Sequence, residues 1–297
     1  MISVIIPVYK NIEEFVKNLK KNYPYLRGNE IIIVNDDPSM SIKEDLKEFK
    51  DIILLENSRN MGFGETVNKG VKHATRDILL FLNTDVILTD DSYKKAAEQF
   101  KKNPRLFGIS FAQIEKDGSK VGKNIFCWKQ GFFYHSKSHN QTTGLNGWAE
   151  GGSCLIDKKK FDELHGFDPL YSPFYWEDMD LSYRAWKKGY RVVFDASIVV
   201  EHHHGGTTGK YVDSDFKDTI AARNHYIFIW KNITDNELLK EHILSLPYNL
   251  LYFMFKKNKA LIKGFFWAIP KIARIRKTRA LYEYQLTDKE VFNLLRT

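Results

Sequence analysis

An acidic residue lies where a strongly apolar stretch of the chain ends. Residues 77–88 read DILLFLNTDVIL, so a run typical of a strand buried on both faces gives way to Asn83, Thr84 and Asp85. A carboxylate at such a position is costly unless a cation lies close to it. Asn, Thr and Asp are also common turn and N-cap residues, so a purely structural role stays open. The functional alternative is that Asp85 binds Mg²⁺ or Mn²⁺, which in turn binds a diphosphate.

A second acidic cluster, WEDMD at 176–180, enters a predicted helix. Acidic residues in a first helical turn interact favourably with the helix dipole, which is a sufficient structural reason for their presence. Three carboxylates within four residues, beside Tyr175 and Trp176, also favour a general base. Mutual repulsion and apolar neighbours both raise the proton affinity of a carboxylate towards a useful range.

Histidines form a third cluster, EHHHGGT at 201–207, directly after a predicted strand. Alternation along an extended segment points His202 and His204 to the same side. Neutral imidazole is a suitable Mn²⁺ ligand beside a carboxylate, whereas it is unusual for Mg²⁺. Zinc is the rival metal, but the sequence has no HExxH pattern.

The first hundred residues alternate strand and helix patterns. Apolar, β-branched runs are separated by amphipathic segments of helix length, which predicts a parallel sheet covered by helices on both faces. Ligands bind such sheets at the carboxyl ends of the strands. Polar clusters at 36–37, 57–62 and 83–85 fall at three of those ends. The predicted strands are 2–8, 30–35, 51–55 and 77–82, and the predicted helices are 12–22 and 65–74.

Beyond residue 111 the alternation is less regular. Residues 115–148 are rich in Lys, Gly, Ser, Asn, His and aromatic side chains, which suggests a long loop or hairpin beside the site. The sequence EGGSCLID at 150–157 predicts a further strand opened by glycines. We expect a helix at 178–188, two short strands at 191–194 and 197–200, and mainly helix from about residue 216.

Composition limits the class of protein. The 297 residues suffice for one large α/β domain with an appendage, and the hydrophobic content of 43% supports a real core. Cys127 and Cys154 form no CxxC pair, which fits a reducing compartment. No signal-peptide pattern precedes the first strand, and no run approaches the roughly 20 apolar residues of a spanning helix. We therefore expect a cytoplasmic protein.

Positive charge is concentrated near the C-terminus. Residues 251–280 hold nine Lys and Arg and no acidic residue, whereas the whole chain has a formal charge of +8. The rest of the chain is therefore nearly neutral, so nucleic-acid binding by the main domain loses its compositional support. Bulky apolar residues are interleaved with these cations. A basic helix packed on the domain is one explanation, and peripheral attachment through 248–280 to an anionic membrane is the one we favour.

Seven segments taken together resemble the inverting glycosyltransferases of family 2. Their order and spacing match the family pattern across about residues 1–232, and the joint pattern is strong although each piece is weak. The segments are VIIPVY (4–9), VNDD (34–37), NSRNMGFGETVNKG (57–70), LLFLNTDV (79–86), EGGSCLI (150–156), GFDPLYSPFYWEDMDLSYRAWKKGY (166–190) and EHHHGGTTGK (201–210).

The resemblance implies a GT-A fold, an α/β architecture with a mostly parallel, Rossmann-like sheet. It divides residues 1–232 into a nucleotide-sugar half, about 1–110, and an acceptor half, about 111–232, and leaves 233–297 as a helical, basic appendage. Asp36 would contact the uracil or thymine base. The other implied donor contacts are Pro7, Val8 and Tyr9 near the base, Arg59, Asn60 and Gly62 along the nucleoside and phosphates, and Arg223 near the diphosphate unless it is a helix-surface charge.

Catalytic and metal roles follow from the same resemblance. Asp85 matches the last position of the DxD motif and would bind Mg²⁺ or Mn²⁺. Asn83 stands where many relatives have the first Asp; its amide can accept a hydrogen bond from a metal-bound water or a ribose hydroxyl but adds no charge. Asp178 would be the general base, and Glu177 would orient the acceptor. The remaining implied contacts are His202 and then His204 to the metal, and Trp176, Glu150 and Gly151 to the acceptor.

We therefore predict an enzyme that transfers a sugar from a UDP- or dTDP-sugar to a hydroxyl of a growing or lipid-linked cell-surface glycan. The WED and HxH segments are most similar to bacterial rhamnosyltransferases, which makes dTDP-L-rhamnose the first donor to test. Two alternatives stay open. A sugar-phosphate nucleotidyltransferase would normally carry an N-terminal Gly-rich, basic phosphate loop, and VIIPVYKN has none. A non-catalytic nucleotide-sugar or glycan-binding module requires that the acidic base be dispensable.

Overall fold

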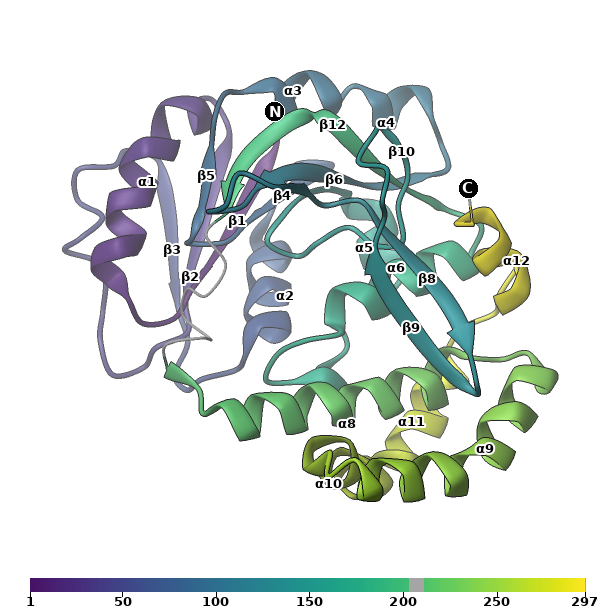
Figure 1. The fold of residues 1–297 in the computed structure, drawn as a ribbon. Helices are drawn as coiled ribbons and strands as arrows, with labels where there is room; N and C mark the ends of the chain where they lie inside the picture. Colours follow the sequence, from purple (N-terminus) through teal and green to yellow (C-terminus); the bar gives the residue numbers. More distant parts are fainter. Residues whose placement is uncertain (203–210, 297) are drawn as a thin grey trace.

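A computed structural model of the chain describes residues 1–202 and 211–296, and a ten-stranded sheet runs through it (Figure 1). The strand order is β10-β12-β6-β11-β4-β1-β2-β3, with β5 paired to β12 and β7 paired to β6. The strands are β1 (Ser3–Val8), β2 (Glu30–Asn35), β3 (Ile52–Glu56), β4 (Ile78–Leu82), β5 (Val86–Leu88), β6 (Leu106–Ile114), β7 (Lys120–Val121), β10 (Gly144–Leu145), β11 (Ser153–Asp157) and β12 (Arg191–His202).

Four parallel strands, β4-β1-β2-β3, form one half of the sheet. The helices α1 (Ile12–Leu26) and α2 (Phe63–His73) alternate with these strands along the chain. Because side chains alternate along a strand, Val4 and Ile6 of β1 join the hydrophobic core that contains α1, whereas Ile5 joins the core that contains α2. The apolar runs are therefore buried on both faces, which confirms the predicted parallel sheet.

The strand β11 reverses the direction of the sheet, because it pairs antiparallel with both β4 and β6. Beyond it, β12 pairs parallel with β6. The prediction of two short strands at 191–194 and 197–200 is wrong, since β12 is one strand from Arg191 to His202. The pairing with β6 shifts between Asp195 and Val199, where Asp195 accepts hydrogen bonds from Ser197. Because of this irregularity, one strand continues through the polar segment that the sequence pattern indicated as a break between two strands.

The second half of the chain adds a hairpin and several short helices. The segment predicted as a loop or hairpin contains the antiparallel pair β8 (Asn124–Lys129) and β9 (Phe132–Lys137), which reaches towards the C-terminal helices (Figure 1). Besides α1 and α2, the helices before residue 203 are α3 (Ser92–Ala96), α4 (Gln99–Lys102), α5 (Lys158–Glu163), the 3₁₀ turn η1 (Pro169–Tyr171) and α6 (Glu177–Lys187).

All of the C-terminal helices except the last form a layer on the side of the molecule away from α3 and α4, and the last one packs beside α6 and β8 (Figure 1). They are α8 (Ser214–Asn232), α9 (Asn236–Phe255), α10 (Lys259–Ala268), the 3₁₀ turn η2 (Ile269–Lys271), α11 (Ile272–Arg279) and α12 (Asp288–Leu294). The packing of α10 on α8 is tight, since a Cβ atom at Gly264 would lie 2.6 Å from Cβ of Ala222. Within the described ranges, no helix combines the length and apolar character needed to cross a bilayer.

Candidate active site

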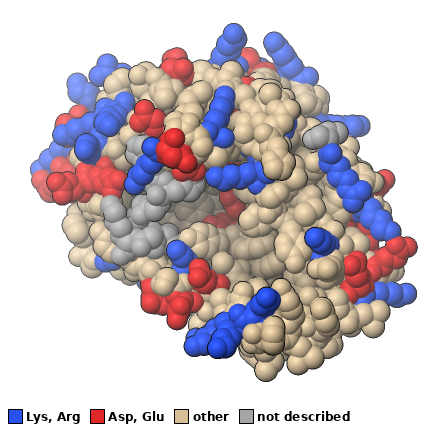
Figure 2. All heavy atoms as spheres, in the orientation of Figure 1, with Lys and Arg blue, Asp and Glu red and all other residues tan. Residues whose placement is uncertain are grey.

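A cavity of about 520 Å³ opens at the carboxyl ends of β1, β2 and β4, the edge at which the sequence predicts a ligand. We call it the strand-end cavity. Figure 2 shows a hollow near the middle of the face in view, with acidic side chains at its base. Most of the residues predicted to bind the nucleotide sugar line the strand-end cavity: Pro7, Val8, Tyr9, Asp36, Asn60, Gly62, Asn83 and Asp85.

Asp36 organises one wall of the strand-end cavity. Its buried carboxylate accepts hydrogen bonds from the backbone N–H groups of Met61 (2.8 Å) and Gly62 (2.9 Å) and from the side-chain amide of Asn57 (2.7 Å). Gly62 has a φ of 81°, and a Cβ atom there would lie 2.7 Å from the carbonyl oxygen of Pro173, so the position requires glycine. Asp36 therefore fixes the 57–62 loop against the cavity.

Two predicted donor ligands, Arg59 and Arg223, are absent from the described lining of either cavity in this site. Arg59 is exposed, and its Nε donates to Sδ of Met61. Arg223 of α8 is only 8% exposed, so the helix-surface alternative is wrong. Its guanidinium donates to the carbonyl oxygen of Ser172 at 2.6 Å, and burial lowers its pKa. Contact of either arginine with a phosphate stays a prediction.

The residue after Arg223 holds the loop that leads into α6. Asn224 is fully buried, and its amide donates to three carbonyl oxygens of that loop, those of Tyr171, Phe174 and Tyr175. Tyr175 and Trp176 have φ values of 72° and 78°, a conformation that side-chain-bearing residues adopt only when their surroundings enforce it. Sequence reasoning singled out Arg223 but missed the positioning role of Asn224, because the loop is about 50 residues away along the chain.

A second cavity, of about 460 Å³, opens at the N-terminus of α6. We call it the α6 cavity. It adjoins the strand-end cavity, since the two share Phe63, Asn83, Phe174 and Tyr175 as lining residues. The predicted catalytic and acceptor residues meet there with one predicted metal ligand: Glu150, Gly151, Trp176, Glu177, Asp178 and His202.

Burial shifts the carboxyl groups of the α6 cavity towards the protonated form. Asp178 accepts hydrogen bonds from the N–H groups of Gly151 (3.2 Å) and Met179 (2.8 Å), yet burial raises its pKa. Burial and then the neighbouring Asp178 charge raise the pKa of Glu177 to about 8, and Oε2 of Glu177 has no partner among the described residues. Burial also raises the pKa of Glu150. Burial therefore increases the proton affinity of all three carboxyl groups that face this cavity.

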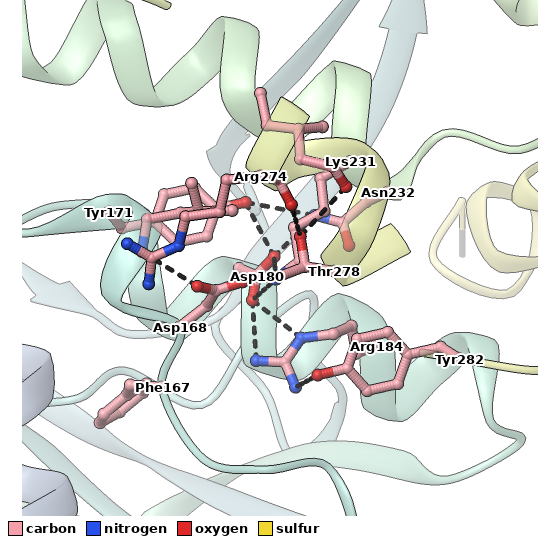
Figure 3. A network of polar contacts seen from close by, with 12 residues as sticks. Phe167, Asp168, Tyr171, Asp180, Arg184, Lys231, Asn232, Arg274, Thr278 and Tyr282 are labelled. Atoms are coloured by element: carbon pink, nitrogen blue, oxygen red, sulfur yellow. Dashed lines mark hydrogen bonds and ion pairs between the residues drawn. The ribbon is translucent and has the colours of Figure 1, made fainter. Parts of the chain in front are cut away.

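Asp180, in the same helical turn, has the opposite character (Figure 3). It is fully buried and lies 2.7 Å from a guanidinium nitrogen of Arg184 and 2.8 Å from Nζ of Lys231. Burial alone would raise the pKa of Asp180, but the two cations lower it to about 2. Two carboxylates of the WEDMD cluster thus face the α6 cavity, and the third joins α6 to α8.

Gln113, which sequence reasoning missed, connects the predicted metal side to the predicted acceptor side. Its side-chain nitrogen donates to Glu150 and to Oγ of Ser153 (3.1 Å), and its carbonyl oxygen lies 2.6 Å from Nδ1 of His202. Nδ1 therefore carries the ring proton, and Nε2 faces Oδ1 of Asp85 at 3.4 Å. The sequence signal that could have identified Gln113 is its position within the apolar segment LFGISFAQI. The structure buries it fully there.

The pairing of Asp85 with His202 fits a divalent cation. A carboxylate oxygen and an imidazole nitrogen, 3.4 Å apart where the two cavities adjoin, are two groups that a cation can bring together. No cluster of three His, Cys, Asp or Glu suited to a metal occurs in the described residues, so phosphates would have to supply further ligands, as they commonly do for Mg²⁺. The second predicted imidazole, His204, lies outside the described residues.

A family model confirms the predicted family. The model for glycosyl transferase family 2 matches residues 3–164, which is more than half of the chain. The chain belongs to glycosyltransferase family 2. The matched range includes β1 to β4 and β11, and it ends before α6 and the WEDMD cluster.

Two curated relatives of this family 2 chain are poly-β-1,6-N-acetyl-D-glucosamine synthases. The Staphylococcus aureus protein is 26% identical over 170 residues, which cover 56% of this chain and 40% of the synthase. The Staphylococcus epidermidis protein is 31% identical over 130 residues, which cover 41% of this chain and 31% of the synthase. The matches thus span less than half of either synthase.

Solved structures of other glycosyltransferases share the fold. GalNAc-T7, solved with UDP, GalNAc and Mn²⁺, superposes with a TM-score of 0.62 at 17% identity, over 94% of this chain and 54% of that one. The mannosyltransferase PcManGT from Pyrobaculum calidifontis, solved with GDP-Man and Mn²⁺, gives 0.54 at 15% identity, over 95% and 81%. S. aureus TarS 1–349 gives 0.51 at 15% identity, over 96% and 93%. The predicted GT-A fold is confirmed.

Proposed function

We propose that this family 2 glycosyltransferase holds a nucleoside diphosphate sugar in the strand-end cavity and an acceptor alcohol in the α6 cavity, and transfers the sugar with inversion. The observation that carries the proposal is the junction of the two cavities. Asp85 lines the donor side, Asp178 lines the acceptor side, and Asn83 lines both. A transferred group can therefore pass from one cavity to the other without leaving the protein.

Asp178 is the general base of this proposal. It takes the proton of the acceptor hydroxyl while that oxygen forms a bond to the anomeric carbon, and the bond from this carbon to the diphosphate oxygen breaks, with its electron pair leaving on the diphosphate. The N–H groups of Gly151 and Met179 hold the Asp178 carboxylate in place. Glu177, with its pKa near 8, keeps a proton at neutral pH and donates it in a hydrogen bond to the acceptor.

Asp85 and His202 would hold the divalent ion, with His204 as a second imidazole. Such an ion, when bound, neutralises the departing diphosphate. Gln113 orients the imidazole of His202 through Nδ1, and Asn83 accepts a hydrogen bond from a ribose hydroxyl or a water. An imidazole in the donor set favours Mn²⁺ over Mg²⁺. Two of the structural neighbours were solved with Mn²⁺, which supports this choice.

The donor and acceptor are inferred more coarsely. A dTDP- or UDP-sugar suits Asp36 as a base contact, with dTDP-L-rhamnose the first donor to test. GDP-mannose must be included because one structural neighbour was solved with it. The acceptor is a growing or lipid-linked cell-surface glycan, since the curated relatives are named as polysaccharide synthases. We place the enzyme at the cytoplasmic face of the membrane, with residues 1–232 as catalytic unit and 233–297 as appendage.

A donor panel tests the reaction. The full chain, with Mn²⁺, is incubated with UDP-, dTDP- and GDP-sugars and glycan acceptors, and nucleoside diphosphate release and the anomeric configuration of the product are measured. We expect one donor class to be consumed and the configuration to be inverted. Asp178→Asn keeps the shape of the side chain and can accept one of the two backbone hydrogen bonds, but it cannot take the proton, so turnover should fall about 10²- to 10⁴-fold. A folded Asp178→Asn protein with near-normal turnover would refute the base assignment.

A further inference from the structure

The exposed side of α9 is unusually apolar. Leu244, Tyr248, Leu251 and Phe255 recur at the spacing of one helix face and are 80%, 70%, 65% and 82% exposed. Glycosyl transfer in the two cavities makes no use of them, because they do not line either one. Large apolar side chains gathered on one exposed face mark an interaction surface rather than chance exposure.

Charge has a single sign in the segment that begins directly after Glu241 of α9. From residue 242 to residue 282 the sequence has no Asp or Glu and nine Lys or Arg. Three of the cations, Lys256, Lys257 and Lys259, are exposed and follow directly after Phe255. The lower edge of Figure 2, where Figure 1 places α9 and α10, shows blue cations beside broad uncharged surface. A partner for this surface must accept both apolar side chains and positive charge.

The apolar surface continues towards the cavities through α10. Phe266 and Trp267 of α10 are 59% and 43% exposed. The ring of Trp267 lies 6.2 Å from that of Phe216, which lines the strand-end cavity. The ring of Phe216 in turn lies 6.5 Å from that of Phe174, which lines both cavities. An aromatic path thus runs from the exposed helices to the cavity junction.

We propose that α9 and α10 dock on an anionic lipid bilayer, and that the aromatic path leads a lipid-linked acceptor from that bilayer to the α6 cavity. We define the docking face as Leu244, Tyr248, Leu251, Phe255, Phe266, Trp267, Lys256, Lys257, Lys259 and Lys263. The second part of the proposal rests on the proposed glycosyl transfer, whereas the docking itself does not.

A bilayer matches this face better than a protein partner does. Lys is depleted from the cores of protein interfaces, yet here it is contiguous with the apolar side chains. At a bilayer, aromatic and leucine side chains enter the interface while Lys and Arg reach lipid phosphates. The 20-residue α9 extends roughly 30 Å, long enough to lie flat on a surface with several contacts.

Vesicle sedimentation with the full chain tests the docking. Vesicles of phosphatidylcholine alone are compared with vesicles of phosphatidylcholine mixed with phosphatidylglycerol. We expect binding to the anionic vesicles only, with release as salt is raised. Leu244→Ser/Leu251→Ser/Phe255→Ser should weaken binding about tenfold or more, because buried apolar area is lost. Lys256→Gln/Lys257→Gln/Lys259→Gln should weaken it similarly and reduce its salt dependence.

Matched variants on the far side of the molecule serve as controls. Lys95→Gln/Lys102→Gln/Arg105→Gln removes the same charge from exposed residues in and after α3 and α4, and Met40→Ser/Ile53→Ser removes exposed apolar side chains near β3. Both should bind anionic vesicles like the unchanged protein. Equal loss in docking-face and control variants, or no preference for anionic vesicles, would overturn the proposal. So would absence of vesicle binding together with a dimer that the Ser variants dissociate, since the face would then bind a second copy.

Activity measurements separate this proposal from the proposed function. Docking-face variants should release nucleoside diphosphate with a water-soluble glycan acceptor at the normal rate, but lose transfer to the same glycan on a lipid carrier in anionic vesicles. Vesicle binding without any nucleoside diphosphate release would refute the glycosyl transfer and leave the docking in place. Normal transfer to the lipid-carried glycan by variants that no longer bind vesicles would refute the acceptor path alone.

Discussion

Carboxyl groups on two sides of α6 have pKa values that are shifted in opposite directions. Glu177 and Asp178 face the α6 cavity, with no cation paired to either in the described residues, and burial raises both pKa values. Asp180 points into a buried network that contains Arg184 and Lys231, and its pKa is lowered to about 2. Burial is common to all three groups. The cations, rather than burial, decide which carboxyl group stays ionised and which becomes a proton acceptor.

The network also positions the α6 cavity (Figure 3). Asp180 accepts hydrogen bonds from Tyr171 (2.8 Å) in the loop before α6 and from Asn232 (2.8 Å) at the end of α8. Arg184 donates to the carbonyl oxygen of Gly166 (2.8 Å). A buried set of charges that joins a helix to its neighbours in this way holds the first turn of α6, and with it Asp178, in one orientation.

Of the substitutions in α6, Asp180→Ala should have the largest effect on stability. The substitution leaves Arg184 and part of the Lys231 charge buried without compensation, which should lower the free energy of unfolding by about 3–5 kcal/mol. Urea denaturation measures it. Asp178→Asn is the matched control, because it removes a carboxylate that no cation neutralises and should leave stability within about 1 kcal/mol. Equal stability of Asp180→Ala and the unchanged protein would show that the network does not stabilise α6.

The next largest effect is expected at Gln113, the uncharged side chain that connects His202 to Glu150. Gln113→Leu removes the acceptor that orients His202 and the donor to Glu150. Loss of such a second partner typically weakens metal binding about 10- to 100-fold. Titration of Mn²⁺ by calorimetry, at constant nucleoside diphosphate, measures it without turnover. Gln113→Glu, which keeps an acceptor near Nδ1, should retain more affinity than Gln113→Leu; the reverse order would exclude the orienting role.

Glu177→Gln should change stability in the direction opposite to Asp180→Ala. The folded state keeps the Glu177 proton up to a pH of about 8, whereas the unfolded chain releases it near 4.5, so stability from this group is lost as the pH rises through that window. The amide avoids this loss, and the variant should be more stable than the unchanged protein at pH 8, with no gain at pH 4. Thermal unfolding at both pH values checks it.

The contribution of Asp180 to stability should depend on pH in the opposite direction. Its folded pKa of about 2 lies below the ordinary aspartate value of 3.8, so its contribution to stability is complete above pH 4 and is lost as the pH falls from about 4 to 2. The difference in stability between the unchanged protein and Asp180→Ala should therefore shrink in acid. A difference that stays constant from pH 6 to pH 2 would contradict the ion-pair explanation.

Sequence patterns located the strand ends because those depend on local order. Apolar runs with two buried faces predicted β1, β2, β3 and β4, and the polar residues after β2, β3 and β4 converged as expected on one cavity. The irregular β12 was read as two strands because a shift in pairing depends on the partner strand, here β6. Gln113 was missed because a polar residue in an apolar strand gains its meaning only from His202 and Glu150 across the sheet.

Sequence by itself determined the family, the GT-A fold, and the chemistry available at 36, 83–85 and 176–180, because these follow from residue type and short-range spacing. Only the tertiary structure decided how that chemistry is divided. It placed Asp180 among cations and Asp178 in a cavity, turned Arg223 and Asn224 towards the loop before α6, and left one side of α9 exposed. Each of these outcomes depends on neighbours distant in the chain, whose electrostatic field and packing no local pattern records.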